Sequence, residues 1–274
     1  MLHKSHLLPV PSYSKQPQNI MACPQPVFLF LLLAVVLSLA ASFTTVSCQD
    51  GDWDSANATS TFNGQDLAGC GFENQTEYKG MTVAVSAAMY ENGKTCGACF
   101  EIRCNGSSAC LPKTIQVTAA KSCAASYFNG TRNWCQEPRK HFELPTSIFS
   151  SISNDEGAVV PVQFRRVTCD RQGGMRFRLL GSGETVGVMV YNVGGTGEVV
   201  DVKMKGDSSA AAASGWVEMI NGDDQRWVTA DRMSSLSGQS LSFRVTSSNG
   251  TVIECMNVAP KDWKFGESYE GDQF

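Results

Sequence analysis

The stretch of sequence that decides the fold is Cys96-Gly-Ala-Cys-Phe-Glu-Ile-Arg-Cys104. It holds three of the eight cysteines that lie between Cys70 and Cys169. An even set of cysteines crowded into one region is typical of a disulfide framework in a secreted chain. The alternative is a zinc site, since Cys96 and Cys99 form a CxxC pair, but no second CxxC pair follows and the nearest histidine is His141. The pattern favours disulfides and predicts neither a metal ion nor another cofactor.

An apolar run of 15 residues, Val27–Ala41, precedes the cysteine-rich region and is interrupted only by Ser38. Its length and the weakly basic stretch before it are typical of a signal peptide, which we expect to occupy residues 1–48. A membrane anchor is the alternative, but an anchor needs about 20 apolar residues. The run therefore predicts a secreted protein.

Five Asn-x-Ser/Thr sequons support the secretory route and are predicted glycosylation sites: Asn57, Asn74, Asn105, Asn129 and Asn249. Outside the crowded region, Cys255 is left as an odd cysteine. We expect a buried thiol there, with an intermolecular disulfide as the alternative.

The composition limits the class of protein. The 274 residues are 42% hydrophobic and 18% charged, which suffices for a sizeable core divided between about two domains. The formal net charge of −4 becomes −6 once a leader containing Lys4 and Lys15 is removed. A protein that binds nucleic acid through its phosphates needs a basic face, so nucleic acid is excluded as a partner.

Alternating hydrophobic residues predict strands in the first part of the mature chain, residues 50–172. The stretches Thr114–Ala119 and Val159–Val167 alternate as strands do. One helix is expected between Pro145 and Gly157. Its hydrophobic residues recur at helical spacing: Leu144, Ile148, Phe149 and Ile152.

The second part, residues 173–274, follows a charged and glycine-rich joint at Asp170–Gly174. Short alternating segments separated by glycine-containing turns predict a β-sandwich here. Three of them have hydrophobic faces of period two: Met175, Phe177 and Leu179; Val186, Val188 and Val190; and Leu241, Phe243 and Val245. The tract Ala210–Ala213 is expected to be a loop insertion.

Several further motifs accompany the cysteine motif in a fixed order: Thr61-Phe-Asn-Gly64, Gly69-Cys-Gly-Phe72, Trp134-Cys-Gln-Glu-Pro138, His141-Phe-Glu143, Val160-Pro-Val-Gln-Phe-Arg-Arg-Val167 and Val258-Ala-Pro-Lys-Asp-Trp-Lys-Phe-Gly266. Together they resemble plant expansins, most closely the α-expansin branch, from Trp53 to Phe274. The nine-residue cysteine motif is the most specific of them.

The resemblance implies a fold and a set of disulfides. A six-stranded double-psi β-barrel, like that of family-45 glycoside hydrolases, is expected in residues 50–172. An immunoglobulin-like β-sandwich of the cellulose-binding type is expected in residues 173–274. The implied disulfide pairs are Cys70–Cys96, Cys99–Cys169, Cys104–Cys110 and, as an addition of the α branch, Cys123–Cys135.

The resemblance also implies a groove on the barrel that is like a catalytic site, at Thr61, Asn63, Asp66, His141, Phe142 and Glu143. Glu143 stands where the family has an aspartate, and its carboxyl reaches one methylene further. Inverting hydrolysis needs two carboxyl groups about 6.5–9.5 Å apart. No aspartate stands where a hydrolase places its base, which leaves Asp66 as the candidate for a second carboxylate. The alternative for Glu143 is a surface carboxylate beside a helix start.

In the sandwich, Trp216 and Trp227 are the candidates for polysaccharide binding, because exposed aromatic rings stack on the faces of sugars. For each of them the alternative is a position in the core. The family's own aromatic positions are occupied here by Glu184, Thr185 and Asp223. Core positions are expected for Trp263 and Phe265. The pair Lys203 and Lys205 either contacts acidic wall polysaccharide or forms a solvated face.

These features predict a secreted, monomeric plant cell-wall protein that binds cellulose and xyloglucan and loosens the wall without hydrolysis. In the family this activity rises at acidic pH, which a carboxyl that must be protonated would explain. One alternative is a wall polysaccharide-binding protein that no longer loosens, favoured by Asn63, Glu184 and Asp223. Another is a weak endoglucanase with Glu143 as acid and Asp66 as base. Membrane contact is expected to be peripheral at most.

Overall fold

The computed structural model describes residues 52–61, 69–71, 76–123, 134–182, 185–207, 215–222, 225–229 and 236–274. All of them belong to one compact unit, Cys48–Phe274. The signal peptide expected in residues 1–48 and the loop expected at Ala210–Ala213 lie outside the described residues. None of the helices in the described part of the chain has the length and hydrophobicity that a membrane span requires.

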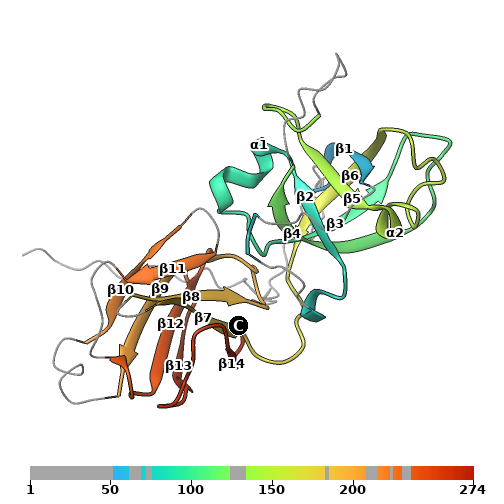
Figure 1. Cartoon of the computed structure of the whole chain (residues 1–274). Helices are drawn as coiled ribbons and strands as arrows, with labels where there is room; N and C mark the ends of the chain where they lie inside the picture. The colour runs from blue at the N-terminus through green and yellow to red at the C-terminus, as the bar shows by residue number, and fades with distance from the viewer. Residues whose placement is uncertain are drawn as a thin grey trace, which may run out of the picture. The chain divides into compact units, whose positions relative to one another are not determined.

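Six of the described strands close into a barrel in the order β1-β5-β2-β4-β3-β6 (Figure 1). Their bounds are β1 (Asp54–Thr61), β2 (Thr82–Val85), β3 (Cys99–Cys104), β4 (Thr114–Ser122), β5 (His141–Pro145) and β6 (Val160–Val167). β1 pairs with β5 and β2 pairs with β4 in parallel, whereas the other neighbours are antiparallel. The connections contain the short helices η1 (Thr76–Tyr78), α1 (Ala87–Tyr90), η2 (Glu91–Gly93) and α2 (Thr146–Phe149).

Three phenylalanines from three strands fill the barrel. The rings of Phe100, Phe142 and Phe164 meet edge to face, with centroids 5.2–5.9 Å apart. Such contacts need large side chains that point inward, and alternation along each strand supplies them. The strands predicted at Thr114–Ala119 and Val159–Val167 are confirmed as β4 and β6.

The predicted helix is much shorter than its hydrophobic spacing indicates. Leu144 is the fourth residue of β5, and α2 is a single turn that begins at Thr146. Leu144 stays in the strand because β5 pairs with β1 along its whole length, up to Pro145. The hydrophobic residues are nevertheless buried, so the spacing identified core positions although the helix over them was wrong.

All four implied disulfides are confirmed: Cys70–Cys96, Cys99–Cys169, Cys104–Cys110 and Cys123–Cys135. Cys96 and Cys99, the CxxC pair, therefore belong to two different disulfides. The zinc alternative is wrong for this pair, because zinc binds thiolates and neither sulfur is free.

Eight more strands form one hydrogen-bonded sheet in the order β13-β12-β9-β10-β11-β8-β7-β14. Their bounds are β7 (Arg176–Ser182), β8 (Thr185–Tyr191), β9 (Val199–Gly206), β10 (Val217–Asn221), β11 (Arg226–Thr229), β12 (Leu241–Ser247), β13 (Val252–Ala259) and β14 (Ser268–Glu270). Phe177 of β7 stacks on Phe243 of β12, with ring centroids 4.7 Å apart. Because β7 and β12 are not neighbours in the sheet, this contact means that the sheet folds over and packs on itself as a sandwich. The predicted sandwich and its three hydrophobic faces are confirmed.

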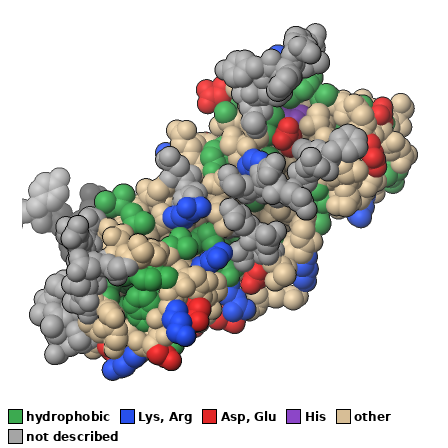
Figure 2. Space-filling model, in the orientation of Figure 1, with side chains coloured by type: hydrophobic (Ala, Val, Ile, Leu, Met, Phe, Trp, Pro, Cys, Tyr) green, Lys and Arg blue, Asp and Glu red, His purple; other side chains and the backbone are tan. Residues whose placement is uncertain are grey.

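Charged side chains of both signs are interspersed on the visible face of the described residues (Figure 2). Many of them are paired, as in Arg165–Glu101 at 2.7 Å and Arg166–Glu198 at 2.6 Å.

Cys255 in β13 is buried and forms no disulfide, which confirms the predicted buried thiol. Burial raises the pKa of this thiol to about 11. The reactive species is the thiolate, of which about one part in a thousand is present at pH 8. We expect a water-soluble aromatic disulfide reagent to leave the native mature protein unlabelled at pH 8 and to label a single thiol after unfolding in guanidinium. Rapid labelling of the native protein would contradict this.

Candidate functional site

The candidate site lies on the outer face of β5. Phe142 and Leu144 are fully buried and point into the barrel, so His141, Glu143 and Pro145 lie on the opposite face of the strand. Phe142 was expected in the groove, and this is a correction. His141, Phe142 and Glu143 are consecutive in the sequence, but side chains alternate along a strand, so the Phe142 side chain points into the core.

Glu143 sits in a row of residues that crosses four strands. Thr59 of β1 lies opposite Glu143 on one side and Ala84 of β2 on the other. Lys121 of β4 lies opposite Ala84. The barrel topology thus sets one carboxyl between a hydroxyl and a small apolar side chain, with a lysine one strand further away.

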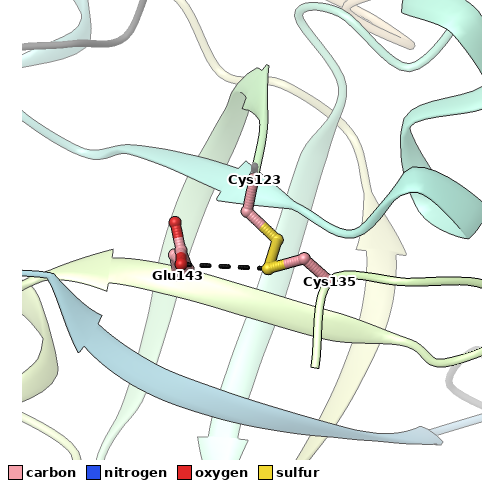
Figure 3. A group of neighbouring side chains, drawn as sticks. All are labelled: Cys123, Cys135 and Glu143. Carbon is pink, nitrogen blue, oxygen red and sulfur yellow. Dashed lines mark hydrogen bonds between the residues drawn. A yellow bond between two sulfur atoms is a disulfide. The ribbon is translucent and has the colours of Figure 1, made fainter. Parts of the chain in front are cut away.

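The Cys123–Cys135 disulfide packs against this row. Both sulfur-bearing residues form a buried cluster with Ala84, and the Cys135 Sγ lies 3.8 Å from the Glu143 Oε1 (Figure 3). A disulfide sulfur carries no hydrogen, so this contact is a hydrogen bond only when the carboxyl is protonated and donates. The three residues are close enough to share a metal ion. Since both sulfurs are spent in the disulfide, Glu143 is the only ligand left among them.

The environment of Glu143 favours its neutral form. Burial raises the pKa of this carboxyl above its ordinary value of 4.5, while the Lys121 ammonium opposes the shift. Among the described residues, no acidic neighbour contributes to the shift. The expected alternative, a solvated carboxylate at a helix start, does not fit a half-buried residue inside β5. Glu143 is therefore available as a hydrogen-bond donor at a higher pH than an ordinary glutamate.

His141 is a buried, neutral neighbour of Glu143 on the same face of β5. Its Nε2 shares a 2.9 Å hydrogen bond with the Thr59 hydroxyl, and its backbone N–H donates to the Ser86 hydroxyl. Burial lowers the pKa of His141 to about 4. The ring is thus uncharged above that pH, and its hydrogen bond orients the Thr59 hydroxyl.

Trp134 is a site residue that our sequence analysis missed. Its ring stacks on His141, with centroids 6.1 Å apart and planes inclined by 24°, and the guanidinium of Arg139 lies 5.2 Å from its centroid. Trp134 is half-buried and precedes Cys135, so the disulfide and the stacking on His141 hold it at this face of β5. The available signal was its position within the Trp-Cys-Gln-Glu-Pro motif next to a paired cysteine.

Three expected groove residues are less fully described. Thr61 ends β1 with its backbone opposite Pro145, and nothing is described of its side chain. Asn63 and Asp66 lie outside the described residues. A second carboxylate at Asp66 therefore stays a prediction.

The two tryptophans expected to bind polysaccharide differ. Trp227 of β11 is only 3% exposed and belongs to the sandwich core, so its expected role is wrong. Alternation along β11 turns it inward together with Thr229. Trp216 is half-buried, with the Lys205 Nζ 4.3 Å and the Arg244 guanidinium carbon 4.6 Å from its ring centroid.

For the other sandwich residues singled out in the sequence, the structure confirms two expected core positions, shows one exposed residue and leaves two undescribed. Trp263 and Phe265 pack on the core as expected. Thr185, in a position where the family has an aromatic residue, is exposed at the start of β8. Glu184 and Asp223 lie outside the described residues.

The topology defines a class of protein by its fold: a closed six-stranded barrel with a half-buried acid beside a disulfide, followed by a β-sandwich. Two family models match the chain accordingly. The model of the expansin C-terminal domain matches residues 175–260, and a double-psi barrel model described as lytic transglycolase matches residues 82–164.

Similar proteins cover most of the chain. Expansin-A22 of Arabidopsis thaliana is 38% identical over 229 residues, which are 81% of this chain and 79% of that protein. Expansin-A10 of Oryza sativa subsp. japonica is 38% identical over 256 residues, 90% of this chain and 96% of that protein. The chain belongs to the expansin family, and the resemblance to the α branch is confirmed.

Solved structures share the fold. The apo expansin of Clavibacter michiganensis matches with a TM-score of 0.62 and 18% identity over 81% of this chain and 97% of its own. A variant of that bacterial protein, solved in complex with cellohexaose, matches with a TM-score of 0.60. The two parts of the predicted fold, the double-psi barrel and the sandwich, are thereby confirmed.

Proposed function

We propose that this expansin loosens the plant cell wall by weakening non-covalent contacts between cellulose and matrix glucans such as xyloglucan, without cleaving them. Its relatives are expansins, a family of non-hydrolytic wall-loosening proteins. The observation that carries the mechanism is the Glu143 carboxyl, half-buried and shifted toward its neutral form. A bacterial relative of the same fold binds cellohexaose, which supports a cellulose-type glucan as ligand.

The barrel face around Glu143 suits binding better than hydrolysis. A neutral carboxyl donates a hydrogen bond to a glucan oxygen, and Thr59 offers a hydroxyl one strand away. Trp134 offers an aromatic ring on which a sugar face can pack. Binding energy gained on a strained glucan segment then peels it from its neighbour. Proton transfer alone does not hydrolyse a glycosidic bond by inversion, because a second carboxylate must activate water.

The setting we propose is extracellular. A secreted monomer, divided at residues 50–172 and 173–274, would act within the wall after loss of residues 1–48. Asn105 and Asn249 are exposed and accessible to glycans, whereas Asn57 is half-buried within β1. We therefore favour Asn105 and Asn249 as the modified sequons among the described residues.

The test is extension under constant load of heat-inactivated plant wall strips with purified mature protein. We expect extension at acidic pH and little at neutral pH, because the active form of Glu143 is protonated. The same samples should release no reducing ends from soluble β-glucan. A folded, disulfide-intact protein that produces no extension would overturn the proposal, and reducing-end release would favour the endoglucanase instead.

A second candidate is a wall polysaccharide-binding protein that no longer loosens. The exposed Thr185 and the buried Trp227 favour this candidate, because they leave fewer exposed aromatic rings on the sandwich for stacking on sugars. Retention on cellulose without extension of wall strips would support this candidate.

A further inference from the structure

A pocket of about 340 Å³ opens on the sandwich, at the ends of β9 and β12 and along β13. It is lined by Lys205, Asp207, Trp216, Ser242, Met256 and Asn257, among others. Its volume lies at the lower end of the range of about 300–1,000 Å³ that is typical of small-ligand sites. The pocket is remote in strand order from β8, where the family's aromatic residues would begin, since β10 and β11 lie between β9 and β8.

The pocket combines an aromatic ring with an apolar wall. Met256 is 52% exposed, although it is a large hydrophobic residue. Trp216 is half-buried and belongs to the same lining. An aromatic ring and a methionine in one pocket lining fit the apolar face of a pyranose.

Polar groups in the pocket keep hydrogen-bonding capacity. The Asn257 side-chain oxygen accepts a hydrogen bond from the Ser240 hydroxyl, and its backbone N–H donates to Ser242. This fixes the orientation of Asn257. Within the described residues its amide nitrogen donates to no protein group, so it can donate to a ligand hydroxyl.

Lys205 differs from the other cations of this surface. Lys203 pairs with Glu218 at 2.5 Å, Arg244 with Glu254 at 2.6 Å, and Lys261 with Asp207 at 3.1 Å. For Lys205 there is no carboxylate partner within the described part of the chain, and its ammonium lies 4.3 Å from the Trp216 ring centroid. The Lys205 charge is therefore not neutralised by a described carboxylate, and it lies at the pocket next to the Trp216 ring.

We propose that this pocket binds a uronic acid residue of an acidic wall polysaccharide. The sugar carboxylate pairs with the Lys205 ammonium, the pyranose face packs on Trp216 and Met256, and the Asn257 amide donates to a hydroxyl. The site is separate from the barrel face around Glu143. This proposal rests on the proposed function only because it requires the protein to be located in the cell wall.

The experiment is titration calorimetry of the mature protein with α-1,4-linked oligogalacturonate, its methyl ester and cellohexaose. We expect oligogalacturonate to bind, with an affinity that falls as salt is added, and the methyl ester to bind at least about tenfold more weakly, because the charge-assisted contact is lost. Equal affinity for the acid and the ester would overturn the proposal, as would the absence of oligogalacturonate binding.

Two variants on β9 distinguish binding in the pocket from a non-specific effect of the protein's positive charge. Lys205→Gln should weaken oligogalacturonate binding by about tenfold. Its matched control, Lys203→Gln, removes the same charge two residues away on β9 and should change the affinity by less than about twofold, since Lys203 is already paired. Lys205→Arg should restore most of the affinity. Equal losses in Lys205→Gln and Lys203→Gln would overturn the pocket.

Wall extension by Lys205→Gln keeps the two proposals distinguishable. We expect extension and cellohexaose binding to match the wild type, with an unchanged melting temperature. A wild-type protein that extends walls but binds no oligogalacturonate would refute the pocket alone. One that binds oligogalacturonate through Lys205 but extends no wall would refute the proposed function alone.

Discussion

Glu143→Ala lowers the extension of wall strips at acidic pH by about two- to tenfold. The reason is the loss of a hydrogen bond from a half-buried, protonated carboxyl to the glucan, since a hydrogen bond between neutral groups contributes about 0.5–1.5 kcal/mol. Extension rate under constant load is the measurement. Glu156→Gln, which alters an exposed carboxylate elsewhere on the barrel, is the matched control and should behave as the wild type.

The direction of the pKa shift gives the pH dependence its sign. Burial raises the pKa of Glu143, so the donor form persists below the raised pKa and is lost as the pH rises through it. Glu143→Gln cannot titrate, so the extension that it supports should be level across the pH range in which the wild type declines. A Glu143→Gln profile that declines in parallel with the wild type would remove Glu143 from the pH response.

The same shift affects folding. The neutral carboxyl is favoured in the folded protein, so its contribution to stability is complete below the ordinary value of 4.5 and is lost as the pH rises through the raised pKa. Loosening and stability should therefore decline in the same direction with pH. The Glu143→Gln variant separates them, because its stability loses this dependence whether or not it extends walls.

The motif of alternating hydrophobic residues was enough to predict β4, β6 and the sandwich strands, because period two along a strand is a direct consequence of burial on one face. It failed at β5, where Leu144 satisfied both a helical and a strand spacing. Only the pairing of β5 with β1 decides between them, and that pairing is not local in the sequence.

The sequence predicted only part of the site, because the rest of the site depends on strand pairing and disulfides that are not local in the sequence. Glu143 followed from the resemblance, but Lys121 and Trp134 acquire their places from strand order and from a disulfide. Trp216 and Trp227 look equivalent in the sequence, yet alternation buries only the second. A residue type indicates what chemistry is available, and the register of its strand decides whether that chemistry reaches solvent.

The disulfides should differ in what they contribute, because they close loops of very different length. Cys99–Cys169 spans 70 residues and Cys104–Cys110 spans 6. In the chain-entropy account, the first constrains the unfolded chain by about 4 kcal/mol and the second by about 2 kcal/mol. The double variant Cys99→Ala/Cys169→Ala should thus lower the free energy of unfolding about twice as much as Cys104→Ala/Cys110→Ala.

Urea unfolding of both double variants, followed by circular dichroism, measures the difference. The native contacts work in the same direction, since Cys99 and Cys169 are buried whereas Cys104 and Cys110 are half-buried. The Cys104–Cys110 pair also joins the hairpin of β3 and β4, which the backbone already holds together from Cys99 to Arg103. Equal losses from the two variants would mean that the long loop is already restricted in the unfolded chain, so that its disulfide removes less entropy than its length implies.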